Sequence, residues 1–380
     1  MTWIKKIWNT LAYITFLSIA SFFLLEVLFS FLPVTESSEV QDVNAENAIL
    51  KFKANSEFRK TLGHDFKHVT IKRTNDFGYF SDYDFNANYD KKIAVVIGDS
   101  FVEAAYVENK KTFHGLLNEQ IEEFVFLPMG VTGSSLAQYL AFADWAKKNL
   151  NPELYFISII QNDFDESSIL YKQVPGHHYF DEKMKLVRLD RKVSTLNKVL
   201  RSSSFVRYLY LDYQITLRTP ILRNDKLLSR FLIWLTGTFT VPKKKEVENK
   251  DYVDSKFKNT DKIIDAFIDQ LHEITQGKPV YFVLDSDRAN IYGGVEVAEL
   301  RAHIWSPYIL YSFKTFKEKC CEMRNFSFID TDSFFRESFL KNSRRFEFEN
   351  DWHWNSLGHA TVASAIKSEI QKEISATSGE

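Results

Sequence analysis

Short apolar runs that alternate with amphipathic segments constrain the fold of this chain more than any other feature of its sequence. A short apolar run closed by glycine or polar residues is typical of a buried parallel strand. Longer segments with apolar residues at helical spacing are typical of the helices that cover such a sheet, and right-handed crossovers through them make the strands parallel. Five strands are expected, at residues 93–97, 124–127, 154–160, 280–284 and 326–329.

Helices are expected at about 112–123, 135–149, 261–275 and 308–323, with a last one after Asn355. Together these elements predict an α/β fold, a three-layer flavodoxin-like sandwich with a roughly five-stranded parallel sheet. The expected domain spans 91–375, and within it about 167–251 lacks the alternation and is expected to be a helical insertion. A polar lead-in of 35–90 precedes this domain, and a frayed tail of 376–380 follows it.

Polar motifs stand at the ends of the first three expected strands. They are Gly98-Asp99-Ser100, then the segment 130–133 ending in Gly133, then the segment 161–163 with Asn162 at its centre. Because the carboxyl ends of parallel strands form the ligand crevice of an open α/β sheet, these motifs are expected to converge. A fourth motif, Asp-Trp-His-Trp-Asn at 351–355, comes just before the last helix.

The four motifs, in this order, resemble the four sequence blocks of the SGNH or GDSL hydrolase superfamily. The resemblance spans most of the chain after its N-terminal segment and implies the SGNH hydrolase fold and a serine esterase activity. It implies that Ser100 is the nucleophile, that Gly133 and Asn162 join the N–H of Ser100 in an oxyanion hole, and that His353 is the base. The last block looks like the variant found in membrane-anchored bacterial members and in relatives that move acetyl groups on polysaccharides.

Two departures from the family pattern affect what the resemblance implies. Many members carry Leu after Gly-Asp-Ser and a glycine soon after, whereas Phe101-Val102-Glu103 follows here, which leaves the shape of the substrate pocket open. The usual last block places Asp three residues before His, and Asn350 stands there, while Asp351 is two residues before His353. Asp351 is expected to be the third member of the triad.

The expected chemistry requires these residue types. A serine hydroxyl is a weak nucleophile at neutral pH, so a base must take its proton as it attacks an ester carbonyl. An imidazole such as that of His353 titrates close to neutral pH and can take and return this proton, and Asp351 would orient it. The developing oxyanion needs donors already in place, and glycine at 133 lets a carbonyl approach its N–H closely.

Each candidate also has a non-catalytic explanation. Ser100 can be a helix cap, Gly133 a turn residue, Asn162 a loop cap and His353 a surface histidine. Asp285, Asp287 and Arg288 follow the fourth strand and either line the crevice or cap and pair with each other. The catalytic interpretation rests on the ordered set of four motifs rather than on any single residue.

The N-terminal segment predicts the compartment. Lys5 and Lys6 precede an apolar stretch of about 7–32, which is long enough to cross a bilayer and has no convincing cleavage site after it. A transmembrane signal anchor over 1–34 is therefore expected, with the N-terminus in the cytoplasm and the catalytic domain in the periplasm or otherwise outside, as a single-pass protein of the inner membrane. Glu26 inside the span either contacts another membrane helix or is protonated or reaches the interface.

Other features predict few partners. A net charge of −2 and a pI near 6.5 give no basic surface for nucleic acid, and Lys243-Lys244-Lys245 is a short solvated run. His177 and His178 are a weak metal signal, so neither a metal nor a cofactor is expected. The apolar stretch 231–241 either packs in the core or lies against a membrane or a lipid-like substrate. The adjacent Cys320 and Cys321 are not expected to form an unstrained disulfide, because neighbouring Cα atoms lie closer together than disulfide geometry favours, and no role is predicted for them.

The leading hypothesis is a membrane-anchored extracytoplasmic serine esterase that hydrolyses a small-acyl ester or an acylated glycan; the small acyl group, with O-acetyl on a cell-envelope glycan as one form, is what the resemblance implies. Two alternatives remain at this stage. An O-acetyltransferase would use the same residues and would require a membrane partner that delivers acyl groups. A catalytically silent envelope scaffold would keep the fold, with His353 turned away from Ser100.

Overall fold

The computed structural model describes residues 2–86, 88–193, 195–214, 250–293, 306–349 and 351–377. The apolar stretch 231–241, the lysine triplet and Asn350 lie outside these residues. The chain divides into two compact units. The first comprises Met1–Ser37, Phe58–Ile71 and Val193–Phe239; the second comprises Ser38–Glu57, Lys72–Lys192 and Thr240–Glu380. The domain boundaries expected from the sequence stay a prediction.

The second unit is built on a five-stranded sheet in which every pair of neighbours is parallel. Its strands, in spatial order, are β4 (Phe124–Gly130), β3 (Lys92–Gly98), β5 (Leu154–Ile159), β8 (Val280–Leu284) and β9 (Phe326–Ile329). This is the flavodoxin-like order, and all five strands agree with those expected from the sequence. Every residue of β4, β5 and β8 is buried, because helices cover both faces. Pro128 is tolerated in β4 because that strand is an edge of the sheet.

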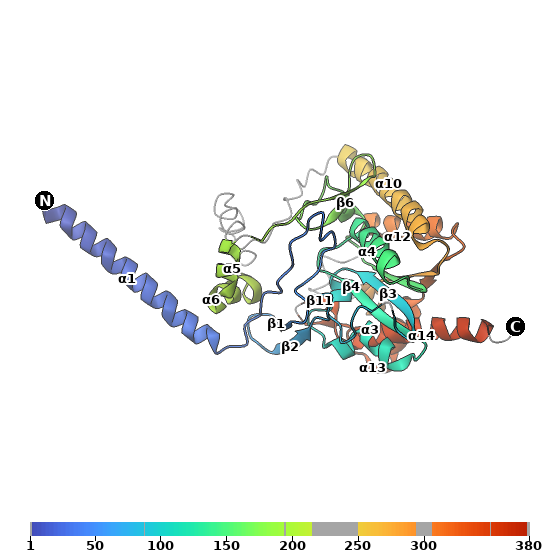
Figure 1. Cartoon of the computed structure of the whole chain (residues 1–380), viewed down its shortest axis with the longest axis horizontal. Coiled ribbons are helices and arrows are strands. Elements are labelled where there is room, and N and C mark those ends of the chain that lie inside the picture. The colour runs from blue at the N-terminus through green and yellow to red at the C-terminus, as the bar shows by residue number, and fades with distance from the viewer. Residues whose placement is uncertain are drawn as a thin grey trace. The chain divides into compact units, whose positions relative to one another are not determined.

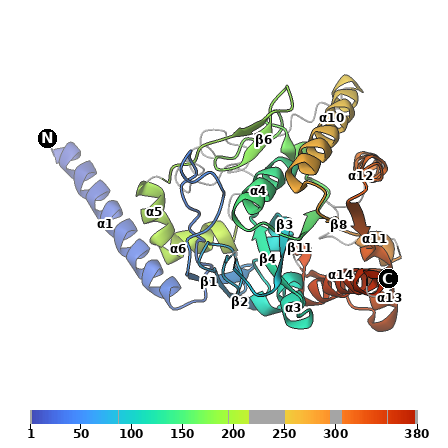
Figure 2. The ribbon, with the colours of Figure 1, turned by 45° about the vertical axis from the view of Figure 1, so that its right-hand side comes forward.

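Two layers of helices enclose the sheet (Figures 1 and 2). One layer contains α3 (Phe113–Gln120), α13 (Thr331–Asn342) and α14 (Ser356–Thr377), and the other contains α4 (Leu136–Asn149), α10 (Lys250–Thr275) and α12 (Pro307–Cys320). The α/β sandwich expected from the sequence is confirmed. Helix α13 was not expected, and α10 begins at Lys250 rather than near residue 261.

Between β5 and α10 the chain is less regular. After the short turn η2 (Asp165–Ser167), the strands β6 (His178–Phe180) and β7 (Leu186–Arg188) pair as an antiparallel hairpin, which the sequence did not suggest. Three short helical elements follow: α5 (Thr195–Ser202), α6 (Ser204–Arg207) and η3 (Tyr208–Asp212). The described part of the expected helical insertion thus starts with a hairpin and continues with helices.

The first unit contains the N-terminal helix α1 (Thr2–Ser30). Among the described residues, it is the one helix long and apolar enough to cross a membrane, a property that a signal sequence shares. Two hydrogen bonds join Thr35 to Asp212 of η3, from its amide at 3.1 Å and from its hydroxyl at 2.6 Å. A separate two-stranded sheet consists of β1 (Glu57–Leu62) and β2 (His68–Arg73).

Candidate active site

Ser100 lies where β3 turns into the short helix α2 (Ser100–Glu103). The side chain of Asp99 caps this helix by accepting the N–H of Phe101 at 3.0 Å. Gly130 at the end of the neighbouring β4 makes room for the turn, because a Cβ there would lie 2.6 Å from the side chain of Val102. The glycine, together with the cap, therefore fixes Ser100 at the carboxyl edge of the sheet.

His353 and Asp351 lie on strand β11 (Asp351–Trp354), which pairs antiparallel with β10 (Glu347–Phe348). Residues two apart on a strand project from the same face, so the spacing of two between Asp351 and His353 suits a strand. The carboxylate Oδ1 of Asp351 lies 2.6 Å from Nδ1 of His353, and Nε2 of the ring lies 2.8 Å from Oγ of Ser100. The structure thus brings the three expected residues into one chain of hydrogen bonds.

The environment of His353 tunes its basicity. Burial lowers the pKa of the imidazole, but the hydrogen bond and charge of Asp351, with the charge of Asp99, outweigh it, so the pKa lies above the ordinary 6.5. The contact of Nδ1 with Asp351 leaves Nε2 to accept the proton of Ser100. A base must be neutral before it acts, so we expect activity to fall as the pH drops through this raised pKa.

Asp99 is a second carboxylate close to the serine. It is buried, and burial raises its pKa to about 6. The hydroxyl of Ser100 lies 3.1 Å from Oδ2 of Asp99, so it has two acceptors within reach, this carboxylate and His353. Asp99 therefore belongs to the electrostatics of the site as well as to the cap.

Replacing Asp99 with asparagine should move the acidic limb of the pH–activity profile to lower pH. The amide keeps an acceptor for the helix cap but removes a negative charge that raises the pKa of His353. Because Asp99 and His353 interact as they titrate, the apparent pKa of the acidic limb is a property of both groups together. We expect this apparent pKa to fall by about half a pH unit or more. The profile of kcat/KM between pH 5 and 8 measures it, and a limb that stays in place or moves upward would contradict this electrostatic role.

Gly133 and Asn162, the expected oxyanion donors, are linked by one polar network. Gly133 has a left-handed φ of +83°, which only glycine adopts without strain. The amide Nδ2 of Asn162 donates to Oε2 of Glu166 at 2.9 Å. The ammonium of Lys172 contacts the same oxygen at 2.5 Å and donates to the carbonyl of Gly133 at 2.8 Å. The sequence did not single out Glu166 or Lys172, because nothing local marks them as partners of Gly133.

A small pocket opens beside the triad. Its volume is about 130 Å³, and Ser100, Asp351 and His353 form part of its wall. The remaining wall is largely apolar, with side chains of Phe101, Ala104, Val107, Phe348 and Trp354. The residues that depart from the family pattern after Ser100 thus include part of the pocket lining.

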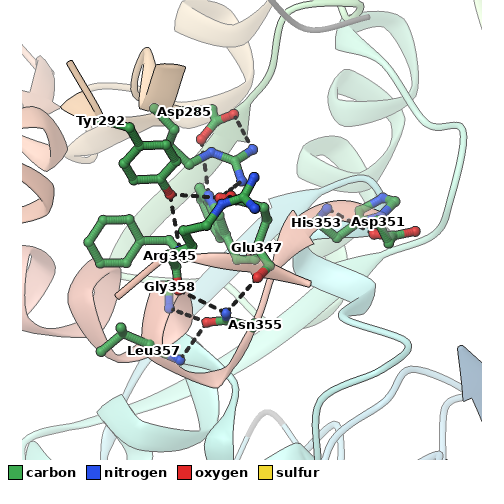
Figure 3. A network of polar contacts seen from close by, with 12 residues as sticks. Asp285, Tyr292, Arg345, Glu347, Asp351, His353, Asn355, Leu357 and Gly358 are labelled. Atoms are coloured by element: carbon green, nitrogen blue, oxygen red, sulfur yellow. Dashed lines mark hydrogen bonds and ion pairs between the residues drawn. The ribbon is translucent and has the colours of Figure 1, made fainter. Parts of the chain in front are cut away.

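A buried charged network lies beside the hairpin that carries His353 (Figure 3). The guanidinium of Arg288 contacts Asp285 at 3.1 Å and Glu347 of β10 at 3.3 Å. The indole N–H of Trp354 donates to Asp285 at 3.0 Å, and the hydroxyl of Tyr292 donates to Glu347 at 2.7 Å. The network ties both strands of the hairpin to the end of β8.

Asn355 connects the same hairpin to the last helix. Its side-chain oxygen accepts the N–H groups of Leu357 and Gly358 at the start of α14, as Figure 3 shows. Its amide donates to the carbonyls of Arg345 and Glu347, at 3.0 and 2.8 Å. Asn355, the last residue of the fourth motif, therefore caps helix α14 and also stabilises the hairpin through hydrogen bonds to its backbone.

Three further residues considered in the sequence, Asp287, His177 and His178, lie outside the triad. Asp287 caps the short helix α11 (Arg288–Ile291) by accepting the N–H of Asn290. His177 and His178 are buried, and burial lowers their pKa values to about 3 and about 4, so both rings are neutral. Within the described ranges, no group of three His, Cys, Asp or Glu side chains could hold a metal ion.

No family model matches the chain, and no curated protein matches it. Among the solved structures that match is a member of the lipolytic protein G-D-S-L family from Veillonella parvula, 11% identical over 73% of this chain and 97% of its own, with a TM-score of 0.34. A lipase/acylhydrolase from Enterococcus faecalis is 12% identical over 74% of this chain and 96% of its own, with a TM-score of 0.37. A psychrotrophic esterase from Pseudoalteromonas sp. is 9% identical over 75% of this chain and 100% of its own, with a TM-score of 0.34.

The first of these structures is named for the G-D-S-L family, which the four sequence motifs resemble.

Proposed function

We propose that this protein is a serine esterase of the SGNH type, which hydrolyses a small-acyl ester through an acyl-Ser100 intermediate. The observation that carries the proposal is the chain of hydrogen bonds from Ser100 through His353 to Asp351. These three residues also form part of the wall of a pocket. A silent scaffold was expected to have His353 turned away from Ser100. The 2.8 Å contact between them favours the enzyme.

The residues divide the chemistry between them. Nε2 of His353 takes the hydroxyl proton as Oγ of Ser100 forms a bond to the carbonyl carbon of the ester. The carbonyl oxygen becomes an oxyanion, which the N–H groups of Ser100 and Gly133 and the amide of Asn162 stabilise. The C–O bond to the alcohol then breaks, and His353 returns the proton to the leaving oxygen. Water repeats the sequence on the acyl-serine and releases the acid.

The pocket limits the acyl group. Its volume of about 130 Å³ is a little less than that of a cavity of roughly 150 Å³ that holds benzene. An acetyl or butanoyl chain fits such a space, whereas a long fatty-acyl chain does not. The apolar lining favours the methyl end of a short chain. We therefore assign a small acyl group to the substrate, with O-acetyl on a glycan as the form that the sequence resemblance implies.

The purified full-length protein in detergent should hydrolyse 4-nitrophenyl acetate and butanoate, with kcat/KM at least about tenfold lower for the decanoate, because the longer chain cannot enter the pocket.

Asp351→Asn should lower kcat for all three esters by roughly 10²-fold or more, since it removes the group that orients His353. Equal rates for the three chain lengths would contradict the assignment of a small acyl group. Acetyl transfer from the nitrophenyl ester to an added oligosaccharide would identify the O-acetyltransferase, for which a membrane partner would deliver the acyl groups in the cell.

We also propose that α1 is a retained anchor, with Lys5 and Lys6 in the cytoplasm and the catalytic unit outside, in the periplasm of a cell with two membranes. Contacts of Glu26 support retention. Its carboxylate accepts hydrogen bonds from the hydroxyl of Ser203 at 2.5 Å and from the N–H groups of Ser204 and Phe205 at 2.7 and 3.1 Å. Cleavage after α1 would leave the start of α6 without this partner. These contacts also give Glu26 a partner within the chain itself.

The anchor has a direct test in intact cells. Mass spectrometry of the membrane-extracted protein should recover peptides from the segment 7–32, and carbonate should not release the protein. Protease added to spheroplasts should digest the catalytic unit while a cytoplasmic marker stays intact. A mature chain that begins after Pro33, found in the soluble fraction, would show that the segment is a cleaved signal peptide.

A further inference from the structure

A buried ion pair joins the two segments that supply the oxyanion donors. The side chain of Lys172 is only 6% exposed, and that of Glu166 is largely covered. Neither residue is part of the triad, and neither lines the pocket beside Ser100. Burying a charged pair is costly unless its geometry and hydrogen bonds compensate. The position of the pair behind Gly133 and Asn162 points to a role in the reaction.

The first part of that role is geometric. An Asn amide has two N–H groups, and Glu166 accepts one of those of Asn162 at 2.9 Å, which fixes the side-chain rotamer and leaves the other N–H for a substrate oxygen. Lys172 donates to the carbonyl of Gly133 at 2.8 Å, which holds the left-handed residue in place. A single carboxylate oxygen, Oε2 of Glu166, accepts from both Asn162 and Lys172, so the two donor segments share one anchor.

The second part is electrostatic. A carboxylate that holds the amide of Asn162 also places a negative charge next to the point where an oxyanion develops, which opposes the reaction. The ammonium of Lys172, at 2.5 Å from that carboxylate, cancels the charge. Donors arranged before the reaction stabilise the transition state most when no opposing charge lies beside them. Glu166 thus orients the amide of Asn162. Lys172 cancels the charge of Glu166, so that this amide can stabilise a negatively charged oxygen.

We propose that Lys172 and Glu166 are positioning residues of the oxyanion hole: Glu166 orients the amide of Asn162, while Lys172 holds Gly133 and neutralises Glu166. This inference rests on the proposed esterase function. It predicts that the effects of the two residues on kcat are coupled: loss of the Lys172 cation lowers kcat chiefly because the negative charge of Glu166 remains.

The test is a double-mutant cycle on the full-length enzyme with 4-nitrophenyl acetate. Lys172→Met should lower kcat by roughly 10²-fold while KM changes less than about threefold, because the donors act on the transition state more than on the bound ester. Adding Glu166→Gln to Lys172→Met should recover at least about tenfold of the loss, since the opposing charge is gone and an acceptor for Asn162 remains. The matched control is Lys148→Met on α4, which removes a 67% exposed lysine paired with Asp144 and should leave kcat unchanged.

A second pair of variants keeps the proposal testable if Lys172→Met does not fold. Glu166→Gln alone should keep kcat within about threefold of the wild type, whereas Glu166→Ala, which cannot orient Asn162, should lower it by about tenfold or more at a similar KM. Thermal unfolding of each variant separates a loss of stability from a loss of catalysis.

Two results would overturn the inference. They are a Lys172→Met enzyme with wild-type kcat, and a double variant no faster than the single one. Failure of the proposed function looks different, because the wild-type enzyme would then neither hydrolyse the ester nor form an adduct at Ser100 with a fluorophosphonate. An active, Ser100-dependent wild type with no coupling between Lys172 and Glu166 would remove this inference alone.

Discussion

Replacing Ser100 with alanine should lower kcat for a short acyl ester by roughly 10⁴-fold or more, because the hydroxyl oxygen is the proposed nucleophile that forms the acyl intermediate. The rest of the site should survive. Ser100 begins α2, but the cap of that helix comes from Asp99, and His353 keeps its contact with Asp351. The variant should therefore unfold at nearly the wild-type temperature while losing its turnover.

Two measurements define this result. Initial rates of ester hydrolysis give the loss of kcat, and intact-protein mass spectrometry after treatment with a fluorophosphonate should show one adduct on the wild type and none on Ser100→Ala. The control is Ser364→Ala on α14, an exposed serine whose hydroxyl donates to the carbonyl of Ala360, and it should keep full activity and labelling. Residual activity above about a tenth of the wild type would exclude Ser100 as the nucleophile.

Replacing Arg288 with leucine should destabilise the protein by about 3–5 kcal/mol, because it leaves Asp285 buried without its cation and leaves the buried Glu347 with only its pair to the partly exposed Arg345. The Arg288 side chain is only 2% exposed, so water cannot compensate for the loss. The hairpin that carries His353 is attached to the sheet through this network, and kcat should fall as well. Urea unfolding monitored by fluorescence measures the change, with Arg336→Leu as control: Arg336 is 43% exposed, and its pair with Asp332 should contribute less than about 1 kcal/mol.

The loss of stability should depend on pH. Burial already raises the pKa of Asp285, and Arg288 opposes that rise, so the leucine variant should raise it further. A carboxyl whose folded pKa is raised above its unfolded value stabilises the fold below the unfolded pKa and loses that contribution as the pH rises through the folded pKa. The difference between variant and wild type should therefore shrink as the pH falls from 7 towards 5. A difference that is constant over this range, or no larger than that of Arg336→Leu, would contradict the unpaired-carboxylate explanation.

The sheet and the four motifs could be predicted because their signals are local. Each strand is a short run of apolar residues, and Ser100, Gly133 and Asn162 follow the strand ends directly, so knowing the strands places the residues at one edge. The sequence favours Asp351 because it is the carboxylate nearest to His353 along the chain. The reason that a spacing of two works is the strand β11, which the sequence did not indicate.

The supporting residues could not be predicted, because each is defined by a partner far away in the sequence. The sequence indicates only that Arg288 either lines the crevice or pairs nearby, because its second partner, Glu347, lies far along the chain on the β10–β11 hairpin. Lys172 lies in a segment without periodicity, and its hydrogen bond to the carbonyl of Gly133 connects it to the site. The strands of the β6–β7 hairpin have three residues each, too few for an alternating pattern to be recognised.

The order of the site along the chain has a consequence for biosynthesis. Ser100 lies at the end of the first strand of the sheet, whereas His353 lies on the hairpin just before α14, the last helix. Synthesis proceeds from the N-terminus, so Ser100, the proposed nucleophile, leaves the ribosome long before His353, the proposed base. A nascent chain therefore carries an unactivated serine until nearly its whole length has been made. An enzyme exported during translation would thus acquire ester-cleaving activity only near the end of its synthesis, after most of the chain has been transferred to its final compartment.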